Sequence, residues 1–305
     1  LPKLVLDRNV SIGIYYQQKY DFTRALDIRF KSSRGRSDGV VETLYKRLRF
    51  EQDGSLNAVT PAIAFEVTKR LSLGMAVNLW RSTWLGANGW EQQIERSEFA
   101  LRLEDTEYSQ YVSKSRYEDF RGENVTIGAL WNPLDKWSFG LRYDSAFTGE
   151  ADFTSESRRF LYRFFPEGIE RPAEVSGMAP LKEKRNIRFP ATYAFGVAHR
   201  VNDRYTVSLD VTTTDWNDFW FKDRSGNRFS LVNAKNLDAI WYAPSFDRTY
   251  TIRLGSEYVF VPRQPAEKLG HILSARGGLF FDQEPASGEP DNFWGVALGF
   301  GLLTK

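Results

Sequence analysis

The chain has 305 residues, of which 42% are hydrophobic and 15% aromatic, with a formal net charge of +2 and no cysteine. The small net charge argues against a nucleic-acid surface, and the lack of cysteine excludes a disulfide framework and thiol chemistry. No run of 18 apolar residues occurs, which excludes a helical membrane protein but not one built of alternating strands. The sequence starts at Leu1 without a signal peptide, so we expect a processed or truncated chain.

Three hairpins of one design follow each other along the chain. Residues 63–80, 127–144 and 195–211 each contain a strand, a short polar turn and a returning strand. Alternate residues are apolar, as in Leu71, Leu73, Met75, Val77 and Leu79, and the residues between them are small or polar. The C-terminal half repeats the pattern over 250–258 and 294–300. Since successive side chains of a strand point to opposite faces, each strand has one apolar face.

The connections between these strands alternate in length. The short ones are 68–70, 133–136 and 201–204, and the long ones are 81–123, 148–190 and 216–248. Outer-membrane barrels combine tight periplasmic turns with long extracellular loops in this way. Alternation alone would also fit a soluble lipocalin-like barrel or a sandwich, but neither needs the unequal loops. We therefore predict an all-β fold, a transmembrane antiparallel β-barrel of the outer-membrane type.

Aromatic residues cluster in two of the expected long loops. Exposed apolar groups of this size usually mark a binding surface, and we predict that they collect an apolar ligand. They could equally form the private core of the loops or an interfacial girdle. The aromatic residues at 219–221 and 240–242 are interpreted as an interfacial belt. The candidate ligand-binding residues are Trp80, Trp84, Trp90, Phe160, Phe164 and Phe165.

The charged residues of the strands share the face opposite the apolar one and would line the lumen. They are Arg142, Asp144, Asp210, Arg253, Glu257 and Arg276. A fatty-acid carboxylate would bind an arginine fork in a dry pocket, whereas a hydrocarbon would need none. With three charges of each sign, a salt-bridge ladder between the barrel walls is the competing interpretation. We predict ligand contacts for Arg142, Arg253 and Arg276, and foremost for the first two.

Residues 188–221 resemble a family of outer-membrane transporters of hydrophobic compounds that includes the fatty-acid channel FadL and the toluene channel TodX. The shared run is a proline, a Gly-Val-Ala-His-Arg strand, an Asn-Asp-Arg turn and a strand ending in Thr-Asp-Trp. Further matches lie at 132–153, 249–260 and 273–303. The resemblance implies an integral β-barrel of the bacterial outer membrane for passive uptake of long-chain fatty acids or hydrocarbons. It also implies extracellular apolar loops, a lumen pocket and a lateral exit to the bilayer, without a cofactor.

The family is similar to a 14-stranded barrel plugged by an N-terminal hatch, whereas about ten strands and no hatch are identified here. We therefore expect residues 1–305 to be a single β-barrel domain lacking the hatch and the terminal strands, as in a fragment. Alternatively, short strands around 40–50 and 99–112 close a smaller barrel. The resemblance also implies a kinked third strand with a lateral gap, where Gly13 is the candidate hinge, although glycine can also serve packing.

Catalytic chemistry is not expected. His199 lies on the apolar face and His271 in a turn region, so neither suits a catalytic base, and no metal site is predicted. Two functions stay open: a transporter, or a transporter-like barrel that acts as a scaffold in a secretion or surface complex. A water-filled porin is third, because small lumen residues such as Ala62 and Ala76 argue against a charged eyelet. The expected partners are a hydrophobic small molecule, outer-membrane lipid and lipopolysaccharide, without nucleic acid; the sequence specifies no protein partner.

Overall fold

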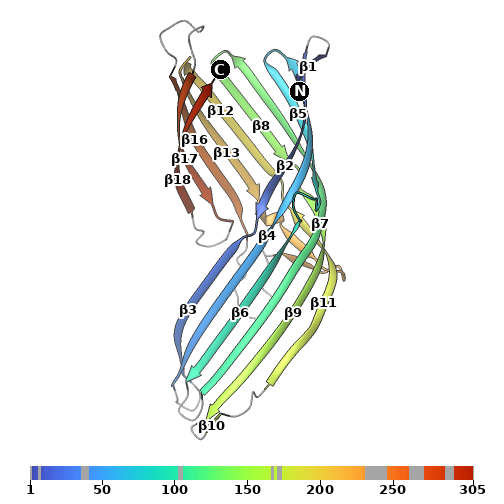
Figure 1. Cartoon of the computed structure of the whole chain (residues 1–305), viewed down its shortest axis with the longest axis vertical. Helices are drawn as coiled ribbons and strands as arrows, with labels where there is room; N and C mark the ends of the chain where they lie inside the picture. The colour runs from blue at the N-terminus through green and yellow to red at the C-terminus, as the bar shows by residue number, and fades with distance from the viewer. Residues whose placement is uncertain are drawn as a thin grey trace.

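The computed structural model describes residues 2–5, 8–35, 41–101, 106–165, 168–169, 174–230, 246–260, 271–285 and 292–304. In these ranges eighteen strands form one antiparallel sheet (Figure 1). No helix in these ranges is long and apolar enough to cross a membrane. The elements are β1 (Pro2–Val5), β2 (Arg8–Asp21), β3 (Arg24–Gly35), β4 (Val41–Thr68), β5 (Leu71–Trp80), β6 (Gly89–Leu101), β7 (Thr106–Leu134), β8 (Trp137–Asp144), β9 (Phe147–Phe165), β10 (Gly168–Ile169), β11 (Glu174–Phe189), β12 (Thr192–Asn202), β13 (Tyr205–Asp215), η1 (Trp216–Asp218), β14 (Trp220–Lys222), β15 (Arg228–Ser230), β16 (Arg248–Phe260), β17 (His271–Gln283) and β18 (Asn292–Thr304).

The upper part of the molecule in Figure 1 is a curved wall, which we call the barrel wall. Tight turns at 69–70, 135–136 and 203–204 join its strands at one end, where both termini also lie. These turns confirm the predicted short connections. In the described part of the chain the wall consists of β2, the second half of β4, β5, the second half of β7, β8, β12, β13, β16, β17 and β18.

The register confirms the predicted apolar face of the wall. One row of directly paired residues crosses nine strands and contains apolar side chains throughout: Phe65, Leu73, Ala129, Leu141, Phe195, Val211, Ile252, Phe281 and Trp294. Most of its large side chains are exposed rather than sealed in a centre, as shown by Leu73 at 46% and Leu141 at 59%. Since apolar side chains that face outward around a sheet are stable in acyl chains, this face suits lipid.

The opposite face of the wall is small or polar, also as predicted. Its paired residues include Ala64, Gly74, Gly128, Arg142, Ala194, Thr212, Thr251 and Asp282. This face lines the inside of the curved wall.

A second part of the sheet projects beyond the wall, and we call it the extension (Figure 1). It consists of β3, residues 41–53 of β4, β6, residues 106–118 of β7, β9, β10 and β11. The prediction of long loops at 81–123 and 148–190 is therefore wrong, because most of these residues are in strands. They carry charges on both faces, and this hides the alternation of apolar residues by which a strand is recognised.

Two strands, β4 and β7, run through both parts and bend where the parts meet. Gly54 on β4 has a φ of 132°, and a Cβ there would collide with the carbonyl oxygen of Gly89. Asp119 on β7 has a φ of 51°, a left-handed conformation that aspartate adopts more readily than most residues. Both backbone irregularities lie where the extension meets the wall.

The expected extra strands around 40–50 and 99–112 are present, but they belong to the extension and do not close a smaller barrel. In the described ranges β18 pairs only with β17, and β2 pairs with β1 and β4. No ladder among these residues joins β2 to β18.

Candidate functional site

Aromatic side chains fill the inner side of the sheet where the wall meets the extension, and we call them the aromatic cluster. Trp80 stacks on Phe147 with ring centroids 5.1 Å apart, and Phe147 stacks on Phe189 at 5.2 Å. Trp90 stacks on Tyr117 at 4.3 Å. Trp80 and Phe189 are each 1% exposed. The members are Tyr20, Phe22, Trp80, Trp90, Tyr117, Phe120, Phe147, Phe153, Phe189, Phe219 and Phe221.

Polar groups fix this cluster at two places. The Nε1 of Trp80 donates to Oδ1 of Asn124 at 2.9 Å. Arg185 lies over the ring of Phe153, with Cζ 3.4 Å from its centroid, and its Nη1 donates to the Tyr117 hydroxyl at 3.1 Å. Its Nε pairs with Oε1 of Glu183 at 2.7 Å, and the Arg185 side chain is only 18% exposed. Sequence reasoning missed Arg185, because it lies in a segment interpreted as a loop.

A cavity of about 260 Å³, the lumen pocket, lies on the wall side of the cluster. Trp80 and Phe147 line it together with Lys19, Arg142 and Asp144. The Nε of Arg142 is 3.5 Å from Oδ2 of Asp144. The pocket therefore combines aromatic rings with two cations and one carboxylate.

Asp144 is the end of a hydrogen-bonded row across four strands of the wall. The hydroxyl of Thr126 donates to Oδ1 of Asp144 at 2.6 Å, and Nδ2 of Asn78 donates to the Thr126 hydroxyl at 3.0 Å. The Thr60 hydroxyl donates to Oδ1 of Asn78 at 3.0 Å. Asn78 and Thr60 are fully buried, so this row holds the polar wall of the lumen pocket in one geometry.

The other predicted arginines lie on the inner face away from the lumen pocket. Nε of Arg276 is 2.7 Å from Oε1 of Glu257 on the neighbouring strand. Arg253 lies opposite Asp210 in the register of β16 and β13. The alternation of residues along the sequence correctly predicted that all of these charges share one face of the sheet. In the structure their ion pairs join neighbouring strands or residues of one strand, not opposite walls.

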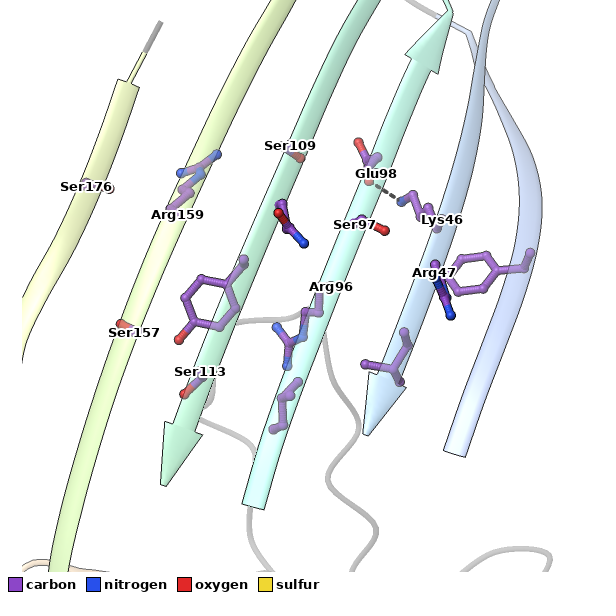
Figure 2. A pocket seen from close by; sticks show the side chains of 15 residues that line it. Lys46, Arg47, Arg96, Ser97, Glu98, Ser109, Ser113, Ser157, Arg159 and Ser176 are labelled. Carbon is purple, nitrogen blue, oxygen red and sulfur yellow. Dashed lines mark ion pairs between the residues drawn. The ribbon is translucent and has the colours of Figure 1, made fainter. Parts of the chain in front are cut away.

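A second and larger cavity, the extension pocket, occupies about 900 Å³ on the face of the extension that continues the lumen face (Figure 2). Its lining includes Ile94 and Arg96 of β6, Tyr111 of β7, and Ser157 and Arg159 of β9. On the other face of the extension, hydrogen bonds from Lys114 and then Arg116 hold the pKa of Glu91 below its ordinary value. These charges on the other face thus pair with each other and not with residues of the extension pocket.

The aromatic residues predicted to bind ligand lie in three different parts of the structure. Trp80 and Trp90 lie in the aromatic cluster, whereas Trp84 is 92% exposed and outside it. Phe160 and Phe164 are half-buried, and they follow Arg159 and Arg163 by one residue, which puts them on the far face of β9 from the extension pocket. The backbone of Phe165 ends β9, while its side chain lies outside the described residues, as do residues 240–242. The interfacial belt predicted for 219–221 is wrong for Phe219 and Phe221, which pack against the aromatic cluster.

The candidate hinge Gly13 lies in a regular part of β2, opposite Ala62. A Cβ at Gly13 would meet nothing within 4 Å. The irregularity of β2 is further along, where the register shifts between Gln18 and Tyr20. Among the described residues no group of three or more His, Asp or Glu side chains could hold a metal ion.

A single-layered wall with a lipid-compatible outside and a small and polar inside defines a β-barrel protein of the outer membrane. The chain belongs to the outer membrane protein transport protein family (OMPP1/FadL/TodX), whose model matches residues 54–290. The family confirms the resemblance noted in the sequence, and with it the predicted fold class and the location in the bacterial outer membrane. No curated protein sequence matches the chain.

Three solved structures match the chain at low sequence identity. A FadL homologue of Pseudomonas aeruginosa superposes with a TM-score of 0.53 at 12% identity, over 96% of this chain and 76% of that one. The toluene transporter TodX of Pseudomonas putida gives a TM-score of 0.37 at 13% identity, over 95% and 78%. The toluene transporter TbuX of Ralstonia pickettii gives 0.38 at 13%, over 95% and 79%. The first of these supports the barrel fold.

Proposed function

We propose that this chain forms a passive channel for small hydrophobic molecules, either long-chain fatty acids or hydrocarbons. The molecule enters at the extension pocket, passes the aromatic cluster and reaches the lumen pocket. The observation that supports this path is the continuous inner face on which both pockets and the cluster lie. The tight turns and both termini are at the opposite end from the extension, which corresponds to a periplasmic wall end and an extracellular extension.

The chemistry of the path suits apolar ligands. Aromatic rings stack readily on other aromatic rings, and a cavity of about 150 Å³ with apolar walls is enough for benzene. The lumen pocket is larger, at about 260 Å³, and Trp80 and Phe147 line it. Two related proteins are toluene transporters, and this chain carries the same kind of cargo in our proposal. From the lumen pocket, the ligand leaves sideways into the bilayer near Gly13.

The test blocks the lumen pocket with a bulky thiol reagent, which reacts at one site because the chain has no cysteine. Thr192→Cys places the thiol in the lining of the lumen pocket, and Tyr193→Cys places it on the lipid-facing side, where Tyr193 is 54% exposed. We expect the reagent to abolish uptake of labelled toluene or hexadecanoate through the first variant and to spare the second. Equal uptake through both labelled variants would contradict the proposed path.

One observation favours the alternative of a scaffold in a secretion or surface complex. Bulky side chains of the aromatic cluster fill the inner side of the sheet. A barrel that carries no cargo does not need an open interior, so this filling suits a scaffold. A scaffold predicts no uptake of any hydrophobic compound by the unmodified protein, together with co-purification of a partner. Uptake above the level of cells lacking the protein favours the channel.

A further inference from the structure

A groove of about 410 Å³, the outer groove, lies on the face of the extension opposite to the extension pocket. Its lining includes Arg29 and Lys31 of β3, the strand at one edge of the extension (Figure 1), with Tyr45 and Arg47 of β4 and Phe99 of β6. These residues alternate along their strands with residues that line the extension pocket, so their side chains point to the other face. Since the extension pocket continues the lumen face, the outer groove continues the lipid-facing side of the wall.

One row of aromatic side chains crosses four strands on this outer face. Tyr45 is directly opposite Phe99, Phe99 is opposite Tyr108 of β7, and Tyr108 is opposite Tyr162 of β9. The ring centroids of Tyr108 and Tyr162 are 6.0 Å apart, and Tyr45 is 43% exposed. Neighbouring strands are about 4.8 Å apart, so the row is roughly 14 Å long. The row therefore offers several rings to one elongated ligand.

Three cations border the rings where β3 and β4 form the groove. The Nζ of Lys31 is 5.4 Å from the centroid of the Tyr45 ring. Arg47 donates to both oxygens of Asp27, at 2.9 and 2.6 Å, and these hydrogen bonds hold the pKa of Asp27 below its ordinary value. Arg29 is 3.7 Å from the same carboxylate, and its side chain is 72% exposed. In the described part of the chain no aspartate or glutamate lines the outer groove, so its lining is cationic.

A ligand that fits this groove combines negative charge with a flat apolar surface. Guanidinium and ammonium groups bind phosphate through charge-assisted hydrogen bonds. The C–H face of a sugar ring packs on aromatic side chains, and tyrosine hydroxyls can bond to the hydroxyls of the sugar. A phosphorylated saccharide has both properties in one molecule.

The position of the groove agrees with such a ligand. Along β4, Tyr45 is nine residues from Gly54, where the extension meets the wall, and this corresponds to roughly 30 Å at about 3.3 Å per residue. The aromatic row thus lies well beyond the lipid-facing part of the wall, on the same outward side. The molecules on that side of a bacterial outer membrane are lipopolysaccharides, whose sugars and phosphates lie beyond their acyl chains.

We propose that the outer groove binds a phosphorylated saccharide of the surrounding lipopolysaccharide, with phosphate at Arg29 and Lys31 and sugar rings on Tyr45 and Phe99. This inference rests on the proposed function only in the orientation of the extension, because an extracellular extension is needed to meet lipopolysaccharide. The groove is on the opposite face of the sheet from the ligand path, so it holds the extension in the saccharide layer without contacting the cargo.

The test measures binding of two probes to the purified chain in nanodiscs of neutral lipid. The first probe is a deacylated, phosphorylated core oligosaccharide, and the second is the same oligosaccharide after removal of its phosphates. Neither probe has an acyl chain, so neither is an apolar ligand of the proposed channel. The variant Arg29→Gln/Lys31→Gln removes two cations of the groove, and Tyr45→Ser removes one ring.

The matched control is Lys114→Gln/Arg116→Gln. It removes two cations from the same face nearer to the wall, where both side chains pair with Glu91 at 2.6 Å. The change in net charge is therefore the same as in the groove variant, but the groove is left intact. Heat-modifiable migration in gels verifies that each variant is folded.

We expect Arg29→Gln/Lys31→Gln to bind the phosphorylated probe roughly tenfold more weakly, because it loses charge-assisted hydrogen bonds. Tyr45→Ser weakens the binding of both probes, and the control keeps the affinity of the unmodified chain. Unchanged affinity of the folded double variant for the phosphorylated probe overturns the proposal. Equal affinity of the unmodified chain for the two probes also overturns it, since phosphate would then have no part in recognition.

A second copy of the chain is the competing occupant of the groove. An unmodified chain that binds neither probe, but forms dimers that Arg29→Gln/Lys31→Gln does not form, assigns the groove to a second copy and overturns the saccharide site. Light scattering of the detergent-solubilised chain measures the oligomeric state.

Uptake of toluene separates this inference from the proposed function. We expect normal uptake by Arg29→Gln/Lys31→Gln, because the groove is not on the ligand path. Normal uptake together with unchanged binding of the phosphorylated probe keeps the channel and removes the saccharide site. An unmodified protein that takes up no hydrophobic compound, yet binds the phosphorylated probe through Arg29 and Lys31, keeps the saccharide site and removes the channel.

Discussion

At the residue scale, the position of an arginine relative to its carboxylates decides what it can bind. Arg276 and Glu257 are 2.7 Å apart, whereas Arg142 shares the lumen pocket with Lys19 and only one acid, Asp144. Alternation of small and charged residues along the sequence was sufficient to place these side chains on the inner face. It could not show which of them meet across strands, because that depends on register.

The two foremost arginine candidates give the first prediction. Replacing Arg142 and Arg253 together by alanine is expected to lower fatty-acid uptake severalfold, because the carboxylate loses its charge-assisted partners, and to leave hydrocarbon uptake unchanged. Uptake of labelled hexadecanoate and toluene in cells expressing each variant measures this. Arg70→Ala is the control, since Arg70 is in a tight turn and pairs with Asp135 at 3.5 Å. Unchanged acid uptake in the double variant would remove the anchor assignment.

At the scale of single elements, strands with one apolar face were predictable and strands with charges on both faces were not. In β5 the apolar residues alternate strictly, and its two faces are those expected. In β6 the run Glu91 to Glu98 alternates no apolar residues, so it was interpreted as a loop, although it pairs along its whole length with β4 and β7. The aromatic cluster was unpredictable for another reason, since Trp80, Phe147 and Phe189 come from three distant segments.

Flexibility of β2 is the second prediction. Gly13→Val leaves the fold intact, because a Cβ there meets nothing within 4 Å, but a β-branched residue stiffens the strand next to the proposed lateral exit. We expect slower delivery of ligand to the bilayer, measured as a lower initial uptake rate. Gly140→Val on β8 is the matched control, with equally free space around its Cβ. Equal rates in the two variants would mean that Gly13 is not a hinge.

At the scale of the whole molecule, the described residues of the wall form a single layer, so its outer face needs lipid as its packing partner. The exposed row that includes Leu141 and Ile252 is apolar across the sheet, whereas the inner face has small or polar residues at the neighbouring positions. Among the described residues the edges of β2 and β18 are not joined to each other. Backbone groups at such edges are costly in lipid, so we propose that further strands complete this single barrel domain.

The orientation of the wall gives the third prediction. Leu141→Arg puts a charge on the lipid-facing side and should destabilise the folded barrel by about 2–4 kcal/mol if the site is near the middle of the bilayer. Gly140→Arg, one residue earlier, puts the same charge on the inner side and should cost much less. Urea titration of both variants in lipid vesicles measures the free energy of unfolding. A larger loss for Gly140→Arg would reverse the assignment of the two faces.

Gly54 and Asp119, the two residues with positive φ on β4 and β7, lie where the extension meets the wall. Since β4 and β7 run through the bend without interruption, the extension and the wall share these two strands. A substitution at Gly54 or Asp119 is therefore expected to change the orientation of the extension while the residues that line both pockets stay the same.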